Sequence, residues 1–158
     1  MNKIQRIYVD ASAVGGAFNK KFSQRTRPFW DAVQRGEIIV ILSDVLKNEV
    51  DPAPKIVRDF FGALPESQTE WVFATEEAKN LATQYIAENV VGKTSFDDCV
   101  HIALATIAKA DMLVSWNFRH IVNIKRIQGY NSVNMKLGYP QLEIRTPEEV
   151  IHAEYTEI

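Results

Sequence analysis

Short apolar runs alternate along the chain with longer segments that have the spacing of helices. Residues 7–9 and 38–42 are continuously apolar, which is typical of strands covered on both faces. Three further short runs predict strands at residues 71–73, 112–114 and 142–144. Strands separated by helices imply parallel crossovers. The pattern therefore predicts a three-layer α/β domain with a central, mainly parallel sheet flanked by helices.

Residues that favour helix ends delimit the predicted helices. Pro28 and Gly36 bracket a helix over residues 29–35, with Pro at its start and Gly beyond its end. Ser43 can cap a helix that is interrupted at residues 51–54, where two prolines occur. Further helices are predicted through residues 57–61, from Thr75 to about Asn89, over residues 96–109, and from Pro147 behind a capping box at residues 146–149. The segment between Trp116 and the last strand is polar and aromatic, and no helix is predicted there.

Length and composition describe an ordinary globular protein. The chain has 158 residues, of which 46% are hydrophobic and 24% charged, and no linker or repeat divides it. Residues 1–158 are therefore predicted to form one domain. No apolar run approaches the ~20 residues of a membrane span, so no membrane association is expected. The single cysteine, Cys99, cannot form an internal disulfide, which favours a reducing cytoplasm, and it is expected to be a buried thiol.

Basic and acidic residues are unevenly placed along the chain. The net charge is −2, from 20 acids and 18 Lys and Arg, which argues against binding of a polyanion over the whole surface. Residues 11–30 and 112–142 nevertheless contain basic side chains and no acid. These two stretches are either ordinary solvated faces or a rim that binds phosphates.

Acidic side chains occur near the ends of the predicted strands. Asp10 ends the first strand, Glu49 lies almost two helical turns after the second, and Asp98 lies in the first turn of a helix. Asn117 follows the strand at residues 112–114. Ligands of an open parallel sheet gather outside the carboxyl ends of its strands, so these residues are expected at one edge. Each alone has a structural explanation, as a turn residue, a solvated position or a partner of a helix dipole. Together they indicate a site for Mg²⁺ or Mn²⁺, because close carboxylates repel unless a cation lies between them.

Four segments, in this order, carry a resemblance to a known family. The segments are residues 7–12, 42–49, 98–105 and 113–117. With this order and spacing the chain resembles the PIN-domain ribonucleases of the VapC type, which are toxins of bacterial toxin–antitoxin pairs. The resemblance extends from residue 7 to about residue 150. It implies a single PIN-like α/β domain and a metal-dependent endoribonuclease whose catalytic residues are Asp10, Glu49 and Asp98.

The resemblance also implies how these residues would hold Mg²⁺ or Mn²⁺. Asp10 and Asp98 would be the central ligands, and Glu49 would bind directly or through water. The fourth acid of the family falls at Asn117, whose amide offers a carbonyl oxygen without a negative charge. This departure leaves open whether Asn117 is a ligand and whether the site holds one ion or two.

Side chains beside the acids have predicted auxiliary roles. Ser12 matches a small hydroxyl residue that accompanies the first aspartate in similar proteins, where it would orient the carboxylate. Asp97 points about 100° away from Asp98 around the helix, so the two are not expected to bind equally. The resemblance, aligned through Ala103 and Ala105, implies that Asp98 is the ligand. His101 is expected to hydrogen-bond to a carboxylate one turn away, and His120 to contact RNA or a partner.

The partners implied by the resemblance are an RNA substrate, a small VapB-like antitoxin and a second copy of the chain in a homodimer. The side chains expected to contact RNA are Lys20, Lys21, Arg119, His120, Lys125 and Arg126. The alternative is a PIN-fold module with weakened catalysis that binds RNA or protein. Asn117 favours this alternative, whereas the intact Asp10, Glu49 and Asp98 favour the enzyme.

Overall fold

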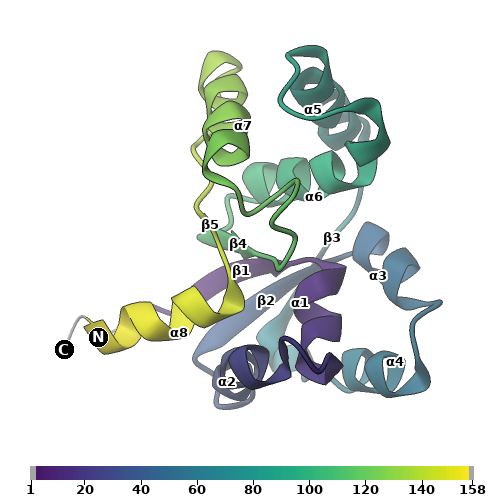
Figure 1. Ribbon diagram of the computed structural model, residues 1–158, viewed down its shortest axis with the longest axis vertical. Helices are drawn as coiled ribbons and strands as arrows, with labels where there is room; N and C mark the ends of the chain where they lie inside the picture. Colours follow the sequence, from purple (N-terminus) through teal and green to yellow (C-terminus); the bar gives the residue numbers. More distant parts are fainter. Residues whose placement is uncertain (1–2, 157–158) are drawn as a thin grey trace.

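A five-stranded parallel sheet forms the centre of the molecule (Figure 1). The computed structural model describes the backbone of residues 3–156 and the side chains of residues 3–151. The strands are β1 (Gln5–Val9), β2 (Ile38–Ser43), β3 (Thr69–Val72), β4 (Met112–Val114) and β5 (Ile144–Arg145). Their order is β3-β2-β1-β4-β5, and every neighbouring pair is parallel. The predicted α/β class is therefore confirmed, although β3 and β5 are displaced by one to two residues from their expected positions.

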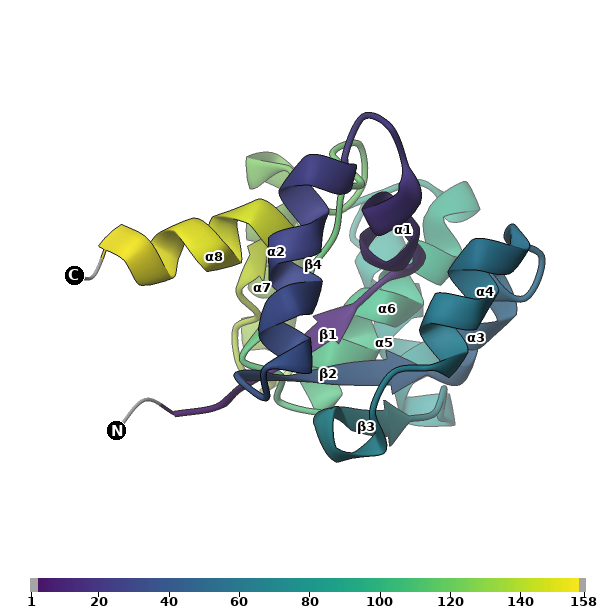
Figure 2. The ribbon, with the colours of Figure 1, turned by 90° about the horizontal axis from the view of Figure 1, so that it is seen from below.

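Helices cover both faces of this sheet. Helices α5 (Glu76–Ala87), α6 (Phe96–Ile107) and α7 (Ile124–Lys136) pack on one face. Helices α1 (Ala11–Gly15), α2 (Ser23–Gln34), α4 (Lys55–Gly62) and α8 (Pro147–Thr156) lie over the other, as Figure 2 shows. Helix α3 (Asp44–Val50) follows β2 and contacts α1 and α4 as well as α6. Short 3-10 turns occur at Gly16–Phe18, Glu66–Gln68 and Lys93–Ser95.

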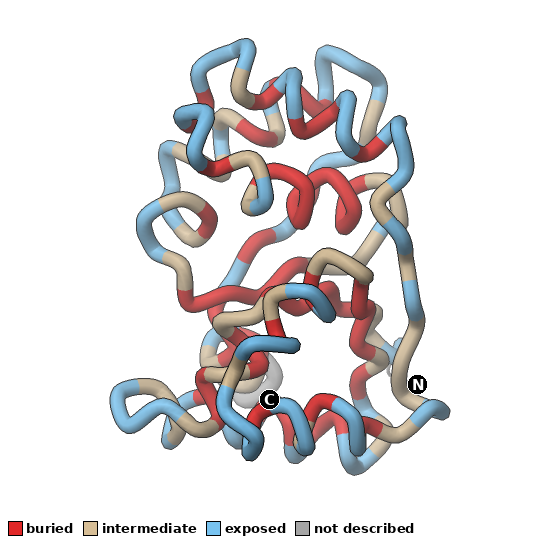
Figure 3. Tube along the Cα trace, turned by 90° about the vertical axis from the view of Figure 1, so that its right-hand side faces the viewer, coloured by how far each residue is buried: buried red, intermediate tan, exposed pale blue. Residues whose placement is uncertain are grey.

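The alternation of side chains along the strands separates two hydrophobic cores. In β1, Ile7 and Val9 pack toward α1 and α2, whereas Tyr8 packs toward α5 and α6. In β2, Val40 and Ile41 divide between the two cores in the same way. The central strands and α6 are the most continuously buried segments of the chain (Figure 3). This double burial explains why residues 7–9 of β1 and 38–42 of β2 are unbroken apolar runs in the sequence.

Three predicted helix caps are present. The hydroxyl of Ser43 accepts a hydrogen bond from the backbone N–H of Leu46, and Thr75 caps α5 in the same way. Thr146 and Glu149 form the reciprocal bonds of a capping box at the start of α8. All three predictions are confirmed. The caps could be predicted from sequence because each cap and its partner are only three positions apart.

Two predicted features of the helices are wrong. Helix α2 starts at Ser23, and Pro28 lies inside it. The proline is tolerated in the second turn, where the buried Phe29 and Trp30 anchor the continuing helix and the Trp30 indole donates to the Ala13 carbonyl at 3.0 Å. Helix α7 was not expected at all, because its sequence is mostly polar.

Helix α7 is nevertheless well defined by its ends and its buried face. The Asn123 side chain caps it by accepting from two backbone N–H groups. Tyr130 and Val133, three residues apart, are buried against α5 and α6. Gly138 follows the helix in the left-handed region, with φ of +84°. In the described part of the chain, no helix is long and apolar enough to cross a lipid bilayer.

Candidate active site

Asp10 lies where β1 ends and α1 begins, at the carboxyl edge of the sheet. Its Oδ1 accepts hydrogen bonds from the Ser12 hydroxyl at 2.7 Å and from the Ala13 backbone N–H at 3.0 Å. Its Oδ2 accepts from the Ser115 hydroxyl, just beyond β4, at 2.6 Å. The residue is only 5% exposed. Burial raises the pKa of the Asp10 carboxyl, and the charge of His101 and the three hydrogen bonds oppose this only in part.

The bond between Asp10 and Ser115 spans the point where the strand order reverses. The chain passes from β1 to β2 and β3 on one side, and β4 and β5 lie on the other side of β1. In open α/β sheets this is where ligands bind, because the connections on the two sides leave a crevice. The Ser12 hydroxyl also accepts from the backbone N–H of Trp116 at 2.8 Å, which ties the two loops together.

Glu49 pairs with a buried histidine. Glu49 lies in the last turn of α3, with its side chain 33% exposed, and its Oε1 is 2.6 Å from Nε2 of His101 in α6. His101 is only 1% exposed. Burial lowers the pKa of its imidazole. The hydrogen bond and charge of Glu49, together with the charges of Asp10 and Asp98, outweigh this and raise the pKa above its ordinary value.

Asp98 pairs with a second histidine. It lies in the first turn of α6, and its Oδ2 is 3.1 Å from Nδ1 of His120, which lies in the loop after β4. Both side chains are about a quarter exposed, at 27% and 28%. Asp97, the alternative ligand, is exposed to solvent. His120 thus contacts an acid of the site, although the sequence indicated RNA or a partner.

Asn117 has a local role in the loop after β4. Its Oδ1 accepts from the backbone N–H groups of Arg119 at 3.2 Å and His120 at 3.0 Å. Its own backbone N–H donates to Ser115. The two bonds from Arg119 and His120 to the amide oxygen form an Asx-type turn. In this arrangement Asn117 shapes the loop that carries His120.

The three predicted acids come from three different elements, and all act on one side chain. Asp10, Glu49 and Asp98 each raise the pKa of the His101 imidazole through their charge. They nevertheless each have a separate internal partner, and among residues 3–151 no three His, Cys, Asp or Glu side chains are placed to hold a metal ion together. Their oxygen donors are of the kind that Mg²⁺ and Mn²⁺ prefer, so the set fits such a cation chemically.

The side chains expected to contact RNA differ in their exposure to solvent and in their partners within the protein. Lys20, Lys21, Arg119 and Lys125 are exposed. Arg126 is partly buried, and its guanidinium donates to the Val90 carbonyl. Four of the six residues expected to contact RNA are therefore at the surface, one is held by the protein and one, His120, pairs with Asp98.

Two aromatic residues beside Asn117 have different environments. The Trp116 indole is buried, donates to the Thr26 hydroxyl at 2.8 Å and stacks on Phe22 with ring centroids 4.6 Å apart. Phe118 is 49% exposed. Trp116 therefore packs within the protein, whereas the ring of Phe118 is open to solvent.

Cys99 is buried, and burial raises the pKa of its thiol to about 12, which keeps the thiol protonated.

Sequence reasoning missed two polar residues that support the acids. Ser115 bonds to Asp10, and the Tyr8 hydroxyl bonds both to Ser43 at 2.7 Å and to Nδ1 of His101 at 2.6 Å. Ser115 and Tyr8 lie inside segments that carry the family resemblance. Their positions in the sequence could have identified them, because Tyr8 interrupts an aliphatic strand and Ser115 directly follows one.

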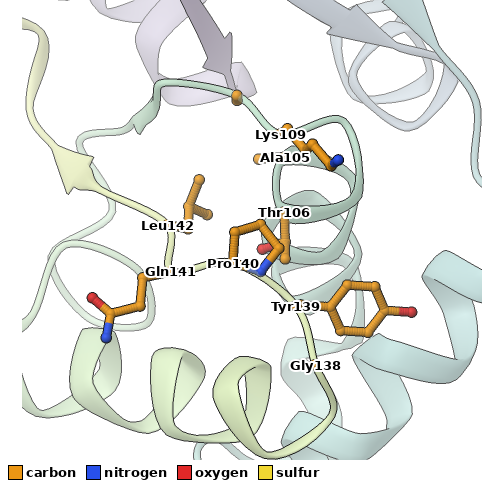
Figure 4. Close-up of a pocket in the computed structure, with 9 residues that line it drawn as sticks. Ala105, Thr106, Lys109, Gly138, Tyr139, Pro140, Gln141 and Leu142 are labelled. Carbon is orange, nitrogen blue, oxygen red and sulfur yellow. The ribbon is translucent and has the colours of Figure 1, made fainter.

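A separate cavity of about 510 Å³ lies away from these acids (Figure 4). It is lined by the end of α6 and by the segment before β5, including Thr106, Lys109, Tyr139 and Leu142. The end of α6 leads into the start of β4, so the cavity is at the amino edge of the sheet, opposite Asp10. None of the predicted site residues lines it.

Comparisons with known proteins bear on the fold. No model of a known protein family matches the chain, and no curated protein matches it. Among solved structures, it is similar to VapC20 of Mycobacterium tuberculosis, a toxin that cleaves the sarcin–ricin loop, with a TM-score of 0.56 and 13% identity over 72% of this chain and 91% of that one. It is also similar to a chain of VapBC2 of Rickettsia felis, solved with a DNA fragment from its promoter, with a TM-score of 0.54 and 12% identity over 89% of this chain and 98% of that one. These likenesses show a fold shared with the VapC PIN-domain toxins.

Proposed function

We propose that this chain, which has a PIN-like fold, is a metal-dependent endoribonuclease that hydrolyses RNA phosphodiester bonds. The observation that carries the proposal is that Asp10, Glu49 and Asp98 come from three elements that meet at the carboxyl edge of the sheet, where Glu49 lies 2.6 Å from the buried His101. Carboxylates cost free energy when they are gathered at one partly buried edge, and a divalent cation is the partner that would offset this cost. The fold similarity to VapC toxins supports the same class of reaction.

Each acid has a distinct task in this proposal. Asp10 is the fixed ligand, because the hydroxyls of Ser12 and Ser115 and a backbone N–H hold both of its oxygens. Asp98 and Glu49 complete the ligand set, Glu49 directly or through water. A bound Mg²⁺ or Mn²⁺ supplies neutralisation of the phosphate charge and activation of water. Asn117 holds the loop of His120 beside the site through its two backbone contacts.

The proposed partners follow from the charges around the site. RNA phosphates would meet the exposed Lys20, Lys21, Arg119 and Lys125, which belong to the acid-free stretches next to Asp10 and Asn117. We further propose that the protein is the toxin of a toxin–antitoxin pair in the cytoplasm. In that pair a small antitoxin restrains the enzyme by placing a Lys or Arg against the acids, and the toxin forms a homodimer.

A second candidate function is supported by Asn117. A PIN-fold module that binds RNA or protein without cutting needs no fourth acid, and the amide oxygen of Asn117 is already used by the loop. The two candidates differ in one measurable property, which is whether RNA bound in the presence of metal is cleaved.

The experiment incubates the purified protein with structured RNA and Mg²⁺ or Mn²⁺, with and without EDTA. Asp10→Asn is the test variant, and Asp111→Asn is its matched control. Asp111 also accepts a backbone N–H bond, from Arg6 at 2.8 Å, but it lies next to β4 at the amino edge. Cleavage that EDTA and Asp10→Asn abolish, and that Asp111→Asn retains, is the expected result. Full activity of Asp10→Asn would contradict the site, and metal-independent binding without cleavage would favour the second candidate.

A further inference from the structure

A buried chain of hydrogen bonds connects the start of α3 to Glu49 near its end. The backbone N–H of Leu46 donates to the Ser43 hydroxyl at 3.1 Å, and that hydroxyl is 2.7 Å from the Tyr8 hydroxyl. The Tyr8 hydroxyl is 2.6 Å from Nδ1 of His101, and Nε2 of His101 is 2.6 Å from Oε1 of Glu49. The chain of bonds passes from α3 through Ser43 at the end of β2, Tyr8 in β1 and His101 in α6, and returns to α3.

When the His101 ring is neutral, the chemistry of the end groups gives this chain of bonds a direction. A carboxylate can only accept, so the hydrogen between His101 and Glu49 lies on Nε2 whether the ring is neutral or charged. In the neutral ring Nδ1 is then an acceptor, and the Tyr8 hydroxyl donates to it. Tyr8 in turn accepts from Ser43, which accepts from the backbone N–H of Leu46. Every hydroxyl and ring nitrogen in the chain is then used, as buried polar groups require.

The environment of Glu49 shows why this chain of hydrogen bonds is needed to hold its side chain in one orientation. Its side chain is 33% exposed at the end of a seven-residue helix, and a glutamate there has several rotamers available. His101 cannot move in the same way, because it is buried in α6 and its ring contacts Tyr8 edge-on with centroids 5.6 Å apart. The bond to His101 uses Oε1, and within residues 3–151 no hydrogen bond to Oε2 is observed.

We propose that His101 is a positioning residue that holds Glu49 at the carboxyl edge of the sheet, with Tyr8 fixing the ring and Oε2 of Glu49 left to meet a divalent cation. This inference rests on the proposed function, because it assigns the purpose of the pair to metal binding. His101 acts through Glu49 and is not itself a ligand. Groups that orient a metal ligand in this way typically contribute 10- to 100-fold to metal affinity.

The experiment measures Mn²⁺ affinity by calorimetry in a double-mutant cycle. His101→Phe keeps an aromatic ring at this position and removes both nitrogens, and Glu49→Gln removes the carboxylate. We expect His101→Phe to weaken Mn²⁺ binding by about 10- to 100-fold in the wild-type background and by less than about twofold in the Glu49→Gln background. Equal losses in both backgrounds, or no loss in the wild type, would overturn the positioning role.

Two further variants guard against an effect of misfolding. His101→Gln can place an amide N–H near the position of Nε2, and it should recover part of the affinity. Tyr8→Phe should weaken binding less than His101→Phe, because it removes only the hydroxyl that fixes the ring. Tyr85→Phe is the matched control, since this buried tyrosine donates to Asn134 on α7 and should leave Mn²⁺ binding unchanged. Loss of affinity in Tyr85→Phe equal to that in Tyr8→Phe would refute a specific role for the chain of bonds.

The outcome also separates this inference from the proposed function. If the wild type neither binds Mn²⁺ nor cuts RNA, the proposed function fails. The bond itself is then tested by long-range ¹H–¹⁵N spectra of His101, where a hydrogen on Nε2 and a change in the Glu49→Gln variant are expected. A neutral ring with its hydrogen on Nδ1 would overturn the inference. If the wild type cuts RNA and His101→Phe binds metal equally well, the inference fails and the function stands.

Discussion

Replacement of Asp10 by asparagine should stabilise the metal-free protein. Asn has the shape of Asp, and its Oδ1 can keep the bonds from Ser12 and the Ala13 backbone N–H. Its NH₂ group can donate to the Ser115 hydroxyl, which is 2.6 Å from Oδ2 in the wild type. The substitution therefore keeps the cap of α1 and removes a carboxylate that is only 5% exposed.

The magnitude follows from two opposing changes. Bonds to a charged group contribute about 1.5–3 kcal/mol and bonds between neutral groups about 0.5–1.5 kcal/mol, so three bonds weaken by roughly 1 kcal/mol each. Burial of one charge costs several kcal/mol even after relaxation, and this cost disappears. The expected net effect is a stabilisation of about 1–2 kcal/mol. At about 2–4 °C per kcal/mol for a chain of this size, the melting temperature in EDTA rises by roughly 2–8 °C.

The pH dependence tests whether burial of the charge is the cause. Burial raises the pKa of Asp10 above its ordinary value of 3.8, so the folded protein holds this proton to a higher pH than the unfolded chain does. The stability linked to this proton is present below the ordinary pKa and is lost as the pH rises through the raised value. Asn does not titrate. The advantage of Asp10→Asn should therefore be small near pH 4 and grow as the pH rises.

The assay is chemical unfolding of EDTA-treated protein at several pH values, with Asp44→Asn as the control. The Asp44 Oδ1 accepts from the backbone N–H groups of Ala74 and Val45, both at 3.0 Å, and an amide oxygen can keep both bonds. This control loses only a favourable charge at the start of α3 and should be destabilised by about 0.3–1 kcal/mol. Destabilisation of Asp10→Asn by more than about 1 kcal/mol at pH 7 would refute the reasoning.

Three further predictions concern the surroundings of the site. Gly16→Ala should lower the free energy of unfolding by about 1–3 kcal/mol, because a Cβ there would lie 2.9 Å from the Trp116 ring. Its control, Gly15→Ala, should raise the free energy of unfolding by about 0.5–1 kcal/mol, because Gly15 has open space and a helical φ of −68°. Asn117→Asp can keep its two backbone contacts and adds a negative charge, so calorimetry should show tighter Mn²⁺ binding; equal affinity would remove this position from the site. Asn123→Ala removes the cap of α7 and should cost about 1 kcal/mol in thermal unfolding, and an unchanged melting temperature would show that the cap is dispensable.

Local and periodic features of the chain were predictable because they depend on near neighbours. Apolar runs predicted every strand, most completely at β1 and β2, which are buried on both faces, whereas the edge strands β3 and β5 are only partly buried. The caps at Ser43 and Thr75 were predictable from residues three positions apart. Helix α7 was not, because its buried face consists of few apolar residues, such as Tyr130 and Val133, set among polar ones. Its stability depends on packing against α5 and α6.

Most partners of the acids could not be predicted, because they are remote in sequence. Ser12, two positions from Asp10, was expected beside that carboxylate and donates to it at 2.7 Å. Glu49 and His101 are separated by 52 positions, and Asp98 and His120 by 22. The topology of a parallel sheet predicts that the acids lie at one edge, but the choice of partner depends on rotamers and on the packing of α3 against α6. The sequence accordingly predicted which elements meet, whereas the hydrogen bonds between them required the structure.

The bond between Ser115 and Asp10 has a consequence for when the site can exist during synthesis. It joins residues 105 positions apart and depends on the pairing of β4 with β1, which closes a long loop of chain. On the ribosome, β1, β2 and β3 emerge before β4, so a nascent chain that ends just before β4 contains Asp10, Glu49 and Asp98 but lacks Ser115, the partner of Asp10 Oδ2. The edge of the sheet that carries the acids is completed only by the last third of the chain. Premature termination, or a delay of translation before β4, therefore yields fragments without an assembled site.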